Sequence, residues 1–487
     1  MPESARRHAW GLLPAILLAI FMSQFDLYVV NVALPVLQRQ FGAGEAALQL
    51  IVGGYAFVYA SGMITAGRLG DILGHRVMFV GGMVAFGLAS LWCGTANSPG
   101  ELVAARLVQG LSAAAMVPQA FALIAVLFEP SERPRALSFF GVTIGVGAVA
   151  GQVLGGVILN ANLLGWGWRP IFLVNVPLAL AGAIIGLRLP GSRPSGTRPR
   201  LDVPGAAGIS AGLALILVPL TLGREDGWPA WTWASFACAV VILAGALWWE
   251  ARLARAAAEP VIDLTLFRER VFSLGLGAGI AIFASFFSFV FTLTLLLQDG
   301  YGLSPLRAGL SFGPLGIAFA AASLRSRGLA VRYGARVIVV GTCIALLGLA
   351  GAVILLAASG GRPSLAALLA AMAVVGAGNG TAVPLLVGVV MQHMTRGAGA
   401  VSGIMTTANQ FAAAAGVAAI GAQFFAVLGA GAGLRAYAHA ATWSTVTSLA
   451  LAIVPVLLTW RLSRAPAKAA AEAEPAPQLA GRRSGEA

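Results

Sequence analysis

Long apolar stretches follow one another along almost the whole chain, separated by short polar segments. Each stretch reaches about 20 residues, the length that an α-helix needs to cross the hydrocarbon core of a bilayer. The pattern therefore predicts fourteen membrane-spanning helices. They cover residues 11–36, 46–67, 77–97, 101–127, 137–160, 170–189, 203–222, 231–250, 271–297, 305–324, 336–357, 364–390, 398–427 and 438–461.

A short sequence occurs twice along this pattern. LGDILGHRVMFVGG (69–82) aligns without gaps with LAVRYGARVIVVGT (329–342), and Gly74 and Arg76 match Gly334 and Arg336. A weaker match aligns Gly110 with Gly376 and Pro118 with Pro384. Two similar halves with a binding site between them are the usual construction of a secondary transporter. Chance similarity in a biased composition is the alternative interpretation.

The repeat and the helix count predict four parts of the chain. Residues 1–190 form an N-terminal six-helix bundle, and residues 191–262 form a basic linker and two extra transmembrane helices. Residues 263–461 form a C-terminal six-helix bundle. Residues 462–487 are rich in Ala, Pro and charge, so we expect a disordered cytoplasmic tail.

Composition excludes a soluble multidomain protein, because 59% of the residues are apolar and only 10% are charged. We interpret the net charge of +13 as a result of how cations are distributed between the two sides of the membrane. If the N-terminus is cytoplasmic, 24 of the 31 Lys and Arg residues fall on the cytoplasmic side, six fall outside, and Arg106 stays within a span. Cytoplasmic loops carry such an excess of cations. We therefore expect both termini in the cytoplasm, a multi-pass protein of the cell membrane, and no nucleic-acid partner.

The loop after the second span carries a charged glycine motif, Gly67-Arg68-Leu69-Gly70-Asp71-Ile72-Leu73-Gly74-His75-Arg76. Its glycines permit a tight turn and close helix approach. Its charges indicate a latch between the cytoplasmic ends of the two halves. The motif resembles the signature loop of the major facilitator superfamily, from which it departs at Ile72 and His75. The predicted latch residues are Gly67, Arg68, Gly70, Asp71, Gly74 and Arg76.

Further motifs resemble the fourteen-helix drug:proton antiporter family within that superfamily. These are residues 26–35 (DLYVVNVALP), 106–110 (RLVQG), 147–156 (GAVAGQVLGG) and 168–177 (WRPIFLVNVP). The third resembles the family's antiporter motif, with Gln152 where Pro is expected. The resemblance covers residues 10–460. It implies the major facilitator fold and efflux of organic compounds driven by proton entry, with a proton gradient as the energy source and no cofactor.

The antiporter motif indicates a hinge in the fifth helix, and simple tight packing of that helix is an equally good interpretation. The residues concerned are Gly147, Gly151, Gln152, Gly155 and Gly156.

Asp26 is the one acid well inside an apolar stretch. Placing a carboxylate inside the membrane costs free energy, so we take such a residue to be functional as the first hypothesis. Arg106 is expected at comparable depth, and in the superfamily fold its helix shares a bundle with that of Asp26. We predict that protonation of Asp26 loosens this pair and biases the exchange between outward and inward states. A permanent structural ion pair is the alternative.

A hydrophobic pocket for the substrate is expected between the halves, where aromatic rings hold flat or cationic molecules. Asn409 and Gln410 are favoured as polar contacts, because burying an amide in an apolar environment costs free energy unless it has a hydrogen-bond partner. Most of the aromatic residues could instead face lipid or the core. The predicted substrate-binding residues are Phe25, Tyr28, Asn31, Tyr55, Gln109, Phe283, Phe287, Asn379, Asn409 and Gln410, accompanied by Phe57, Tyr59, Phe286 and Phe291.

These patterns favour a proton-driven exporter of hydrophobic or cationic small molecules such as drugs or antibiotics. Coupled uptake of a small metabolite is the alternative within transporters, and a membrane-embedded lipid- or glycan-modifying enzyme is an alternative of another class. We expect no catalytic residue and no metal, because the histidines are scattered and the three cysteines lie far apart. The expected partners are a small-molecule substrate, protons and the bilayer, with the chain as a monomer.

Overall fold

The computed structural model describes residues 3–129, 132–162, 165–191, 202–223, 227–255, 264–393 and 398–464. Within these ranges the secondary structure is helical, with no β-strand. The first helices are α1 (Glu3–Phe41), α2 (Glu45–Leu73), α3 (His75–Thr95), α4 (Pro99–Leu127), α5 (Arg133–Ala161), α6 (Pro170–Leu173) and α7 (Asn175–Gly186). Two more follow, α8 (Val203–Leu222) and α9 (Ala230–Arg255). The remainder are η2 (Leu264–Arg268), α10 (Arg270–Leu295), η3 (Leu296–Gly300), α11 (Pro305–Ser311), α12 (Gly313–Tyr333), α13 (Arg336–Ala358), α14 (Leu365–His393), α15 (Ala398–Leu428) and α16 (Gly433–Ser463).

The predicted all-α membrane architecture is confirmed. Thirteen helices among the described residues are long and apolar enough to cross a membrane, and the stretch Pro170–Gly186 is a shorter apolar helix. Most of the predicted linker, and the tail from residue 465, lie outside the described residues.

Two of the predicted spans are broken by prolines. The sixth span divides into α6 and α7 at Val174, and the tenth divides into α11 and α12 at Phe312. Pro177 and Pro314 follow these breaks and have no N–H to donate to the carbonyl four residues earlier. This missing hydrogen bond favours an interruption at each place, although Pro118 and Pro384 lie inside helices that continue unbroken.

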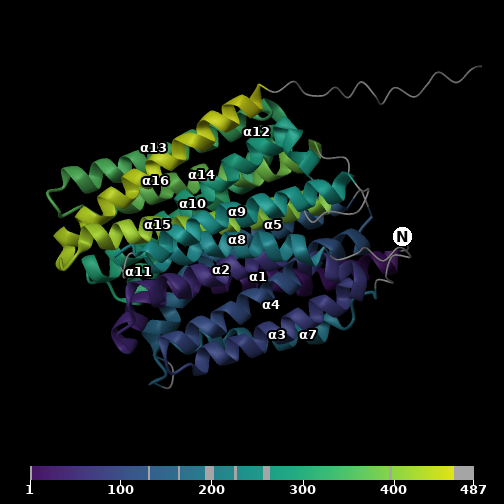
Figure 1. Cartoon of the computed structure of the whole chain (residues 1–487), viewed down its shortest axis with the longest axis horizontal. Coiled ribbons are helices and arrows are strands. Elements are labelled where there is room, and N and C mark those ends of the chain that lie inside the picture. Colours follow the sequence, from purple (N-terminus) through teal and green to yellow (C-terminus); the bar gives the residue numbers. More distant parts are fainter. Residues whose placement is uncertain are drawn as a thin grey trace, which may run out of the picture.

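The helices form two bundles that lie side by side (Figure 1). Helices α1–α7 make the first half, drawn in purple and blue, and α10–α16 make the second, drawn in teal, green and yellow. The halves meet where α2 packs on α15 and where α5 packs on α11 and α12. The extra helices α8 and α9 pack on each other, and α8 contacts both α2 and α15. The extra pair therefore lies across the seam between the halves.

The repeated glycines occupy corresponding places in the two halves. Gly74 ends α2 with a φ of +95°, and Gly334 ends α12 with a φ of +65°, a region in which other residues are strained. A Cβ at Gly110 on α4 would lie 2.5 Å from a backbone oxygen of α2, and one at Gly376 on α14 would lie 2.1 Å from a backbone oxygen of α12. The same helix pair of each half thus approaches closely at a glycine.

Large apolar side chains cover the outer surface of the helices. Val331 on α12 is 91% exposed, and Ile317 on the same helix, Val241 on α9 and Ile354 on α13 are also well exposed. A soluble protein rarely leaves so much apolar surface in contact with water. This surface matches a protein that is surrounded by lipid on its sides.

Candidate functional site

A buried ion pair lies inside the first half. Asp26 on α1 and Arg106 on α4 are both fully buried, and Nη1 of Arg106 donates to Oδ2 of Asp26. The other carboxylate oxygen, Oδ1, accepts from the Gln109 amide at 2.9 Å and from the Asn175 amide at 2.9 Å. We name these four side chains the Asp26 cluster. Every oxygen of the buried carboxylate thus has a donor, as a buried charge requires.

Arg106 is also held on the side away from the carboxylate. Its Nε donates to the carbonyl oxygen of Ile51 on α2 at 2.9 Å, and its guanidinium carbon lies 4.2 Å from the centre of the Tyr55 ring. The ring face attracts the cation, and the carbonyl accepts part of its hydrogen bonding. The cation therefore keeps partners on α2 when its contact with Asp26 changes.

The Asp26 cluster extends through Gln109 to α3. Nε2 of Gln109 donates to the Ser90 hydroxyl at 2.8 Å, and that hydroxyl donates to the Phe86 carbonyl at 2.7 Å. Oε1 of Gln109 accepts from Arg106 at 2.6 Å. Sequence reasoning placed Gln109 in the substrate pocket and gave Asn175 no role. A buried amide directly after the break in a membrane helix was the available signal for Asn175.

The predicted latch residues lie at the turn between α2 and α3. Oδ1 of Asp71 lies 3.4 Å from Nε2 of His75, whose Nδ1 donates to Gln119 Oε1 at 2.8 Å. Arg76 donates to the Leu189 carbonyl at 3.3 Å. Arg68 is half-buried near the end of α2. The contacts named here for Asp71 and Arg76 join elements of the first half, and the latch between halves stays a prediction.

The glycines of the α5 motif lie in tight helix contacts. A Cβ added at Gly147, Gly151 or Gly155 would lie within 2.9 Å of an atom of α1. One added at Gly156 would lie 2.5 Å from the Pro305 carbonyl oxygen on α11, in the other half. The motif thus packs α5 against both α1 and the second half.

Between the halves, α5 borders an apolar cavity, which we name the seam cavity. Its ten lining residues come from both halves and carry no charge. They are Tyr28, Ile144, Gly145, Gln152, Phe286, Val290, Phe312, Leu315, Gly316 and Phe319. Of the predicted substrate-binding residues, Tyr28 lines this cavity, and its ring centre lies 5.3 Å from that of Phe287. Phe286, named beside that set, lines it as well.

The other predicted binding residues are distributed elsewhere. Tyr55 and Gln109 belong to the surroundings of Arg106. Phe25 stacks on Phe21 with 5.8 Å between ring centres, and Phe283 stacks on Phe287 at the same separation. Three amides are buried, Asn31 on α1 and Asn409 and Gln410 on α15, and each has one atom without a hydrogen-bond partner in the described part of the chain.

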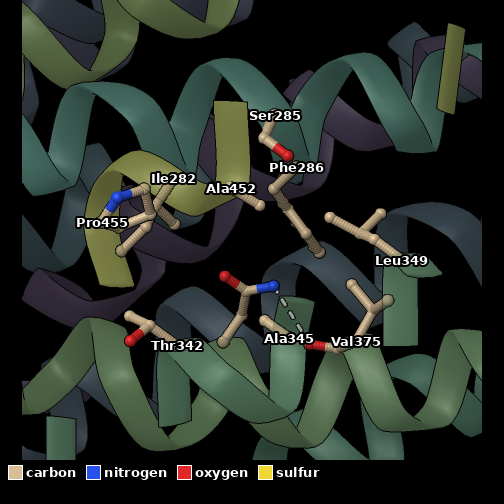
Figure 2. A pocket seen from close by; sticks show the side chains of 10 residues that line it. Ile282, Ser285, Phe286, Thr342, Ala345, Leu349, Val375, Ala452 and Pro455 are labelled. Atoms are coloured by element: carbon tan, nitrogen blue, oxygen red, sulfur yellow. Dashed lines mark hydrogen bonds between the residues drawn. The ribbon is translucent and has the colours of Figure 1, made fainter. Parts of the chain in front are cut away.

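Asn379 borders a second, smaller cavity within the second half (Figure 2). Figure 2 shows Phe286 of α10 on one side of this cavity and Pro455 of α16 on another. The Asn379 amide donates to the Val375 carbonyl at 3.0 Å, which is the dashed line in the figure. Phe286 borders both this cavity and the seam cavity.

Metal ligands are not gathered in the described part of the chain, where no three His, Cys, Asp or Glu side chains lie close enough to hold an ion. The chemistry available in these sites is therefore that of one buried ion pair and of uncharged, mostly apolar cavity walls.

Comparison with known proteins identifies the family. Residues 16–417 match the Major Facilitator Superfamily. The chain is 36% identical over 433 residues to a Streptomyces coelicolor protein described as "Probable actinorhodin transporter". The matched region covers 88% of this chain and 74% of that protein. It is 35% identical to the cephamycin export protein CmcT of Amycolatopsis lactamdurans, covering 82% of each chain. It is 34% identical to the puromycin resistance protein pur8 of Streptomyces alboniger, covering 85% of this chain and 81% of that one.

A solved structure shares the fold. The bacterial homolog of the human lysosomal transporter Spinster, in an inward-facing and unoccupied conformation, superposes with a TM-score of 0.65. The match covers 94% of this chain and 97% of that chain at 17% identity. With the two bundles and the family match together, the protein is a multi-pass membrane transporter, not an enzyme, and it belongs to the major facilitator superfamily.

Proposed function

We propose that this protein is a proton-driven exporter of hydrophobic or cationic small organic molecules, working as an antiporter by alternating access between its two halves. The observation that carries the proposal is the fully buried Asp26 carboxylate, paired with Arg106 inside a membrane-spanning helix. Intramembrane carboxylates of this kind serve as proton carriers in transporters. Relatives described as export or resistance proteins for cephamycin, puromycin and tetracenomycin C support the direction and the substrate class.

Proton binding would act through the Asp26 cluster. A proton on Asp26 removes its negative charge and with it the attraction to Arg106, while Arg106 keeps the Ile51 carbonyl and the Tyr55 ring. Helix α1 then becomes free to move relative to α4. Because α1 packs on the glycines of α5, and Gly156 of α5 touches α11, such a movement reaches the second half. A proton can shift the conformational balance in this way only if one state favours the protonated form.

We place both ends of the chain in the cytoplasm, from the distribution of positive charge. The far end of α1 then lies outside, where the halves are joined. Arg39 lies 3.1 Å from Asp299, and Gln298 donates to the Val32 carbonyl at 2.7 Å. The conformation described here is thus closed on the outer side, and the substrate enters from the cytoplasm.

Inside-out vesicles from a pump-deficient host test this function. The vesicles are energised by respiration, which acidifies the lumen, and three compounds of different charge are offered: puromycin, a cephamycin and tetracenomycin C. We expect at least one compound to accumulate in the lumen and a protonophore to abolish its accumulation. Asp26→Asn should abolish it with unchanged protein in the membrane, whereas Glu101→Gln, outside the Asp26 cluster, should leave it intact.

Two results would contradict the proposal. Full transport by Asp26→Asn removes Asp26 from the coupling. Accumulation of a metabolite in right-side-out vesicles, with no drug accumulation in inside-out ones, favours uptake.

A further inference from the structure

Gln152 stands out among the residues of the seam cavity. The residue is only 4% exposed, and neither its amide oxygen nor its amide nitrogen has a hydrogen-bond partner among the residues that the structure describes. The other lining residues are apolar or aromatic, apart from the hydroxyl of Tyr28. A buried amide that leaves both of its atoms unpaired costs free energy of folding, so it needs a compensating use.

The backbone around Gln152 is fixed by helix packing. A Cβ added at Gly309 on α11 would lie 2.4 Å from the Gln152 carbonyl oxygen, and Gly156, one turn further, meets Pro305 equally closely. Helices α5 and α11 therefore touch through their backbones at this residue and one turn after it. The side chain of Gln152 is presented to the cavity from a rigid position, as a specific binding contact requires.

The walls of the seam cavity indicate what it holds. Tyr28, Phe286, Phe312 and Phe319 offer ring faces and edges from both halves. Because the lining carries no charge, an ion would enter without a partner, which strongly disfavours both cations and anions. The empty space between these walls amounts to about 490 Å³, and this volume includes space that is open to the outside.

From these observations we propose that Gln152 recognises the substrate through hydrogen bonds in the seam cavity. The molecules that fit are uncharged, planar and aromatic, and they carry a hydrogen-bond donor next to an acceptor. The amide oxygen of Gln152 accepts from the donor, and its NH₂ group donates to the acceptor, as in a paired lactam. The rings of both halves stack on the flat body of the molecule. This inference rests on the proposed function and narrows its substrate class to neutral compounds.

Binding to the purified protein in lipid nanodiscs tests the inference without a proton gradient. The probes form a matched series: phenanthridin-6(5H)-one has both groups, its N-methyl derivative has only the acceptor, and phenanthrene has neither. For the wild-type protein we expect the lactam to bind about tenfold more tightly than phenanthrene, as the net contribution of two hydrogen bonds implies. Gln152→Leu keeps the volume and should lose this preference, binding all three probes alike.

Gln49→Leu is the matched control. Gln49 is another buried glutamine with an unpartnered oxygen, on α2 and outside the lining of the seam cavity. We expect this variant to keep the wild-type preference. Thermal unfolding of each variant checks that the fold is intact.

Three outcomes would overturn the inference. They are an unchanged preference in Gln152→Leu, an equal loss of affinity for all three probes, which marks a packing role, and no saturable binding of any probe by the wild-type protein. The result is independent of the vesicle experiment. If the vesicles transport a drug but Gln152→Leu keeps the probe preference, the proposed function stands and the Gln152 site does not. If Gln152→Leu loses the preference but no drug is transported, the site stands and the proposed function does not.

Discussion

At the scale of single residues, the protein depends on a few polar side chains in an apolar interior. Asp26 accepts hydrogen bonds from two other helices, α4 and α7, and Gln109 of α4 also donates to Ser90 on α3. Such a buried pair adds little net stability, because desolvating two charges offsets most of their attraction. Removing one partner is a different matter, because the other charge is then left in a dry site.

The stability of the Asp26 cluster can therefore be separated from its role in transport. Asp26→Asn leaves Arg106 as an uncompensated buried cation and should destabilise the protein by about 3–5 kcal/mol. Asp26→Asn combined with Arg106→Gln has no buried charge and should recover much of this loss, yet it should transport nothing against a gradient. Thermal unfolding in detergent, followed by vesicle transport, measures both quantities. A single variant as stable as the wild type would contradict the argument.

At the scale of elements, glycines set the distance between α5 and its neighbours. Sequence reasoning left open whether the α5 motif is a hinge or a packing surface. The geometry shows packing, since Gly147, Gly151 and Gly155 have α1 within Cβ contact distance and Gly156 has α11. The hinge interpretation stays a prediction beside this packing.

Adding a methyl group at this contact should loosen the outer closure. Gly156→Ala places a Cβ 2.5 Å from the Pro305 oxygen, and Gly309→Ala places one 2.4 Å from the Gln152 oxygen. Neither backbone atom can move aside alone, so each substitution should cost about 1–3 kcal/mol and lower the Tm. Gly351→Ala on α13 is the control, because a Cβ there meets no atom within 4 Å. A Tm drop of the same size in the control would show a general effect of helix substitution.

At the scale of the whole molecule, two similar bundles are joined by a third element. Helix α8 contacts α2 of one half and α15 of the other, beside the seam where the halves must move. The described part of the chain begins and ends at the same end of the molecule (Figure 1), as an even number of membrane crossings requires. We assign that end to the cytoplasmic side because most of the Lys and Arg residues fall there, and cytoplasmic loops carry an excess of cations.

Labelling with a membrane-impermeant thiol reagent tests the orientation. The background variant has Cys93, Cys238 and Cys343 replaced by alanine. We expect Ser359→Cys, between α13 and α14, to react in intact cells. Ser463→Cys, at the end of α16, should react only after the membrane is permeabilised. The opposite pattern would invert the topology and with it the direction of transport.

The sequence by itself determined the helical architecture, the close approaches at the repeated glycines and the pairing of Asp26 with Arg106. These depend on local properties: apolar length, the conformational freedom of glycine, and the cost of a charge in lipid. The breaks at Val174 and Phe312 were not predicted, because a proline also lies inside unbroken helices, as Pro118 does in α4 and Pro384 in α14.

Only the tertiary structure decided which polar residues meet. Gln109 and Tyr55 have the residue types of a substrate pocket, yet they lie against Arg106, and Asn175 joins Asp26 from a helix far along the chain. In the sequence, Gln152 is only a substitution within a motif. The fold places it in an aromatic cavity, with no hydrogen-bond partner among the described residues. The rotation of each helix about its axis assigns a side chain to the bundle interior, the seam or the lipid. Packing between helices sets that rotation, and uniformly apolar helices carry no hydrophobic stripe from which it can be read.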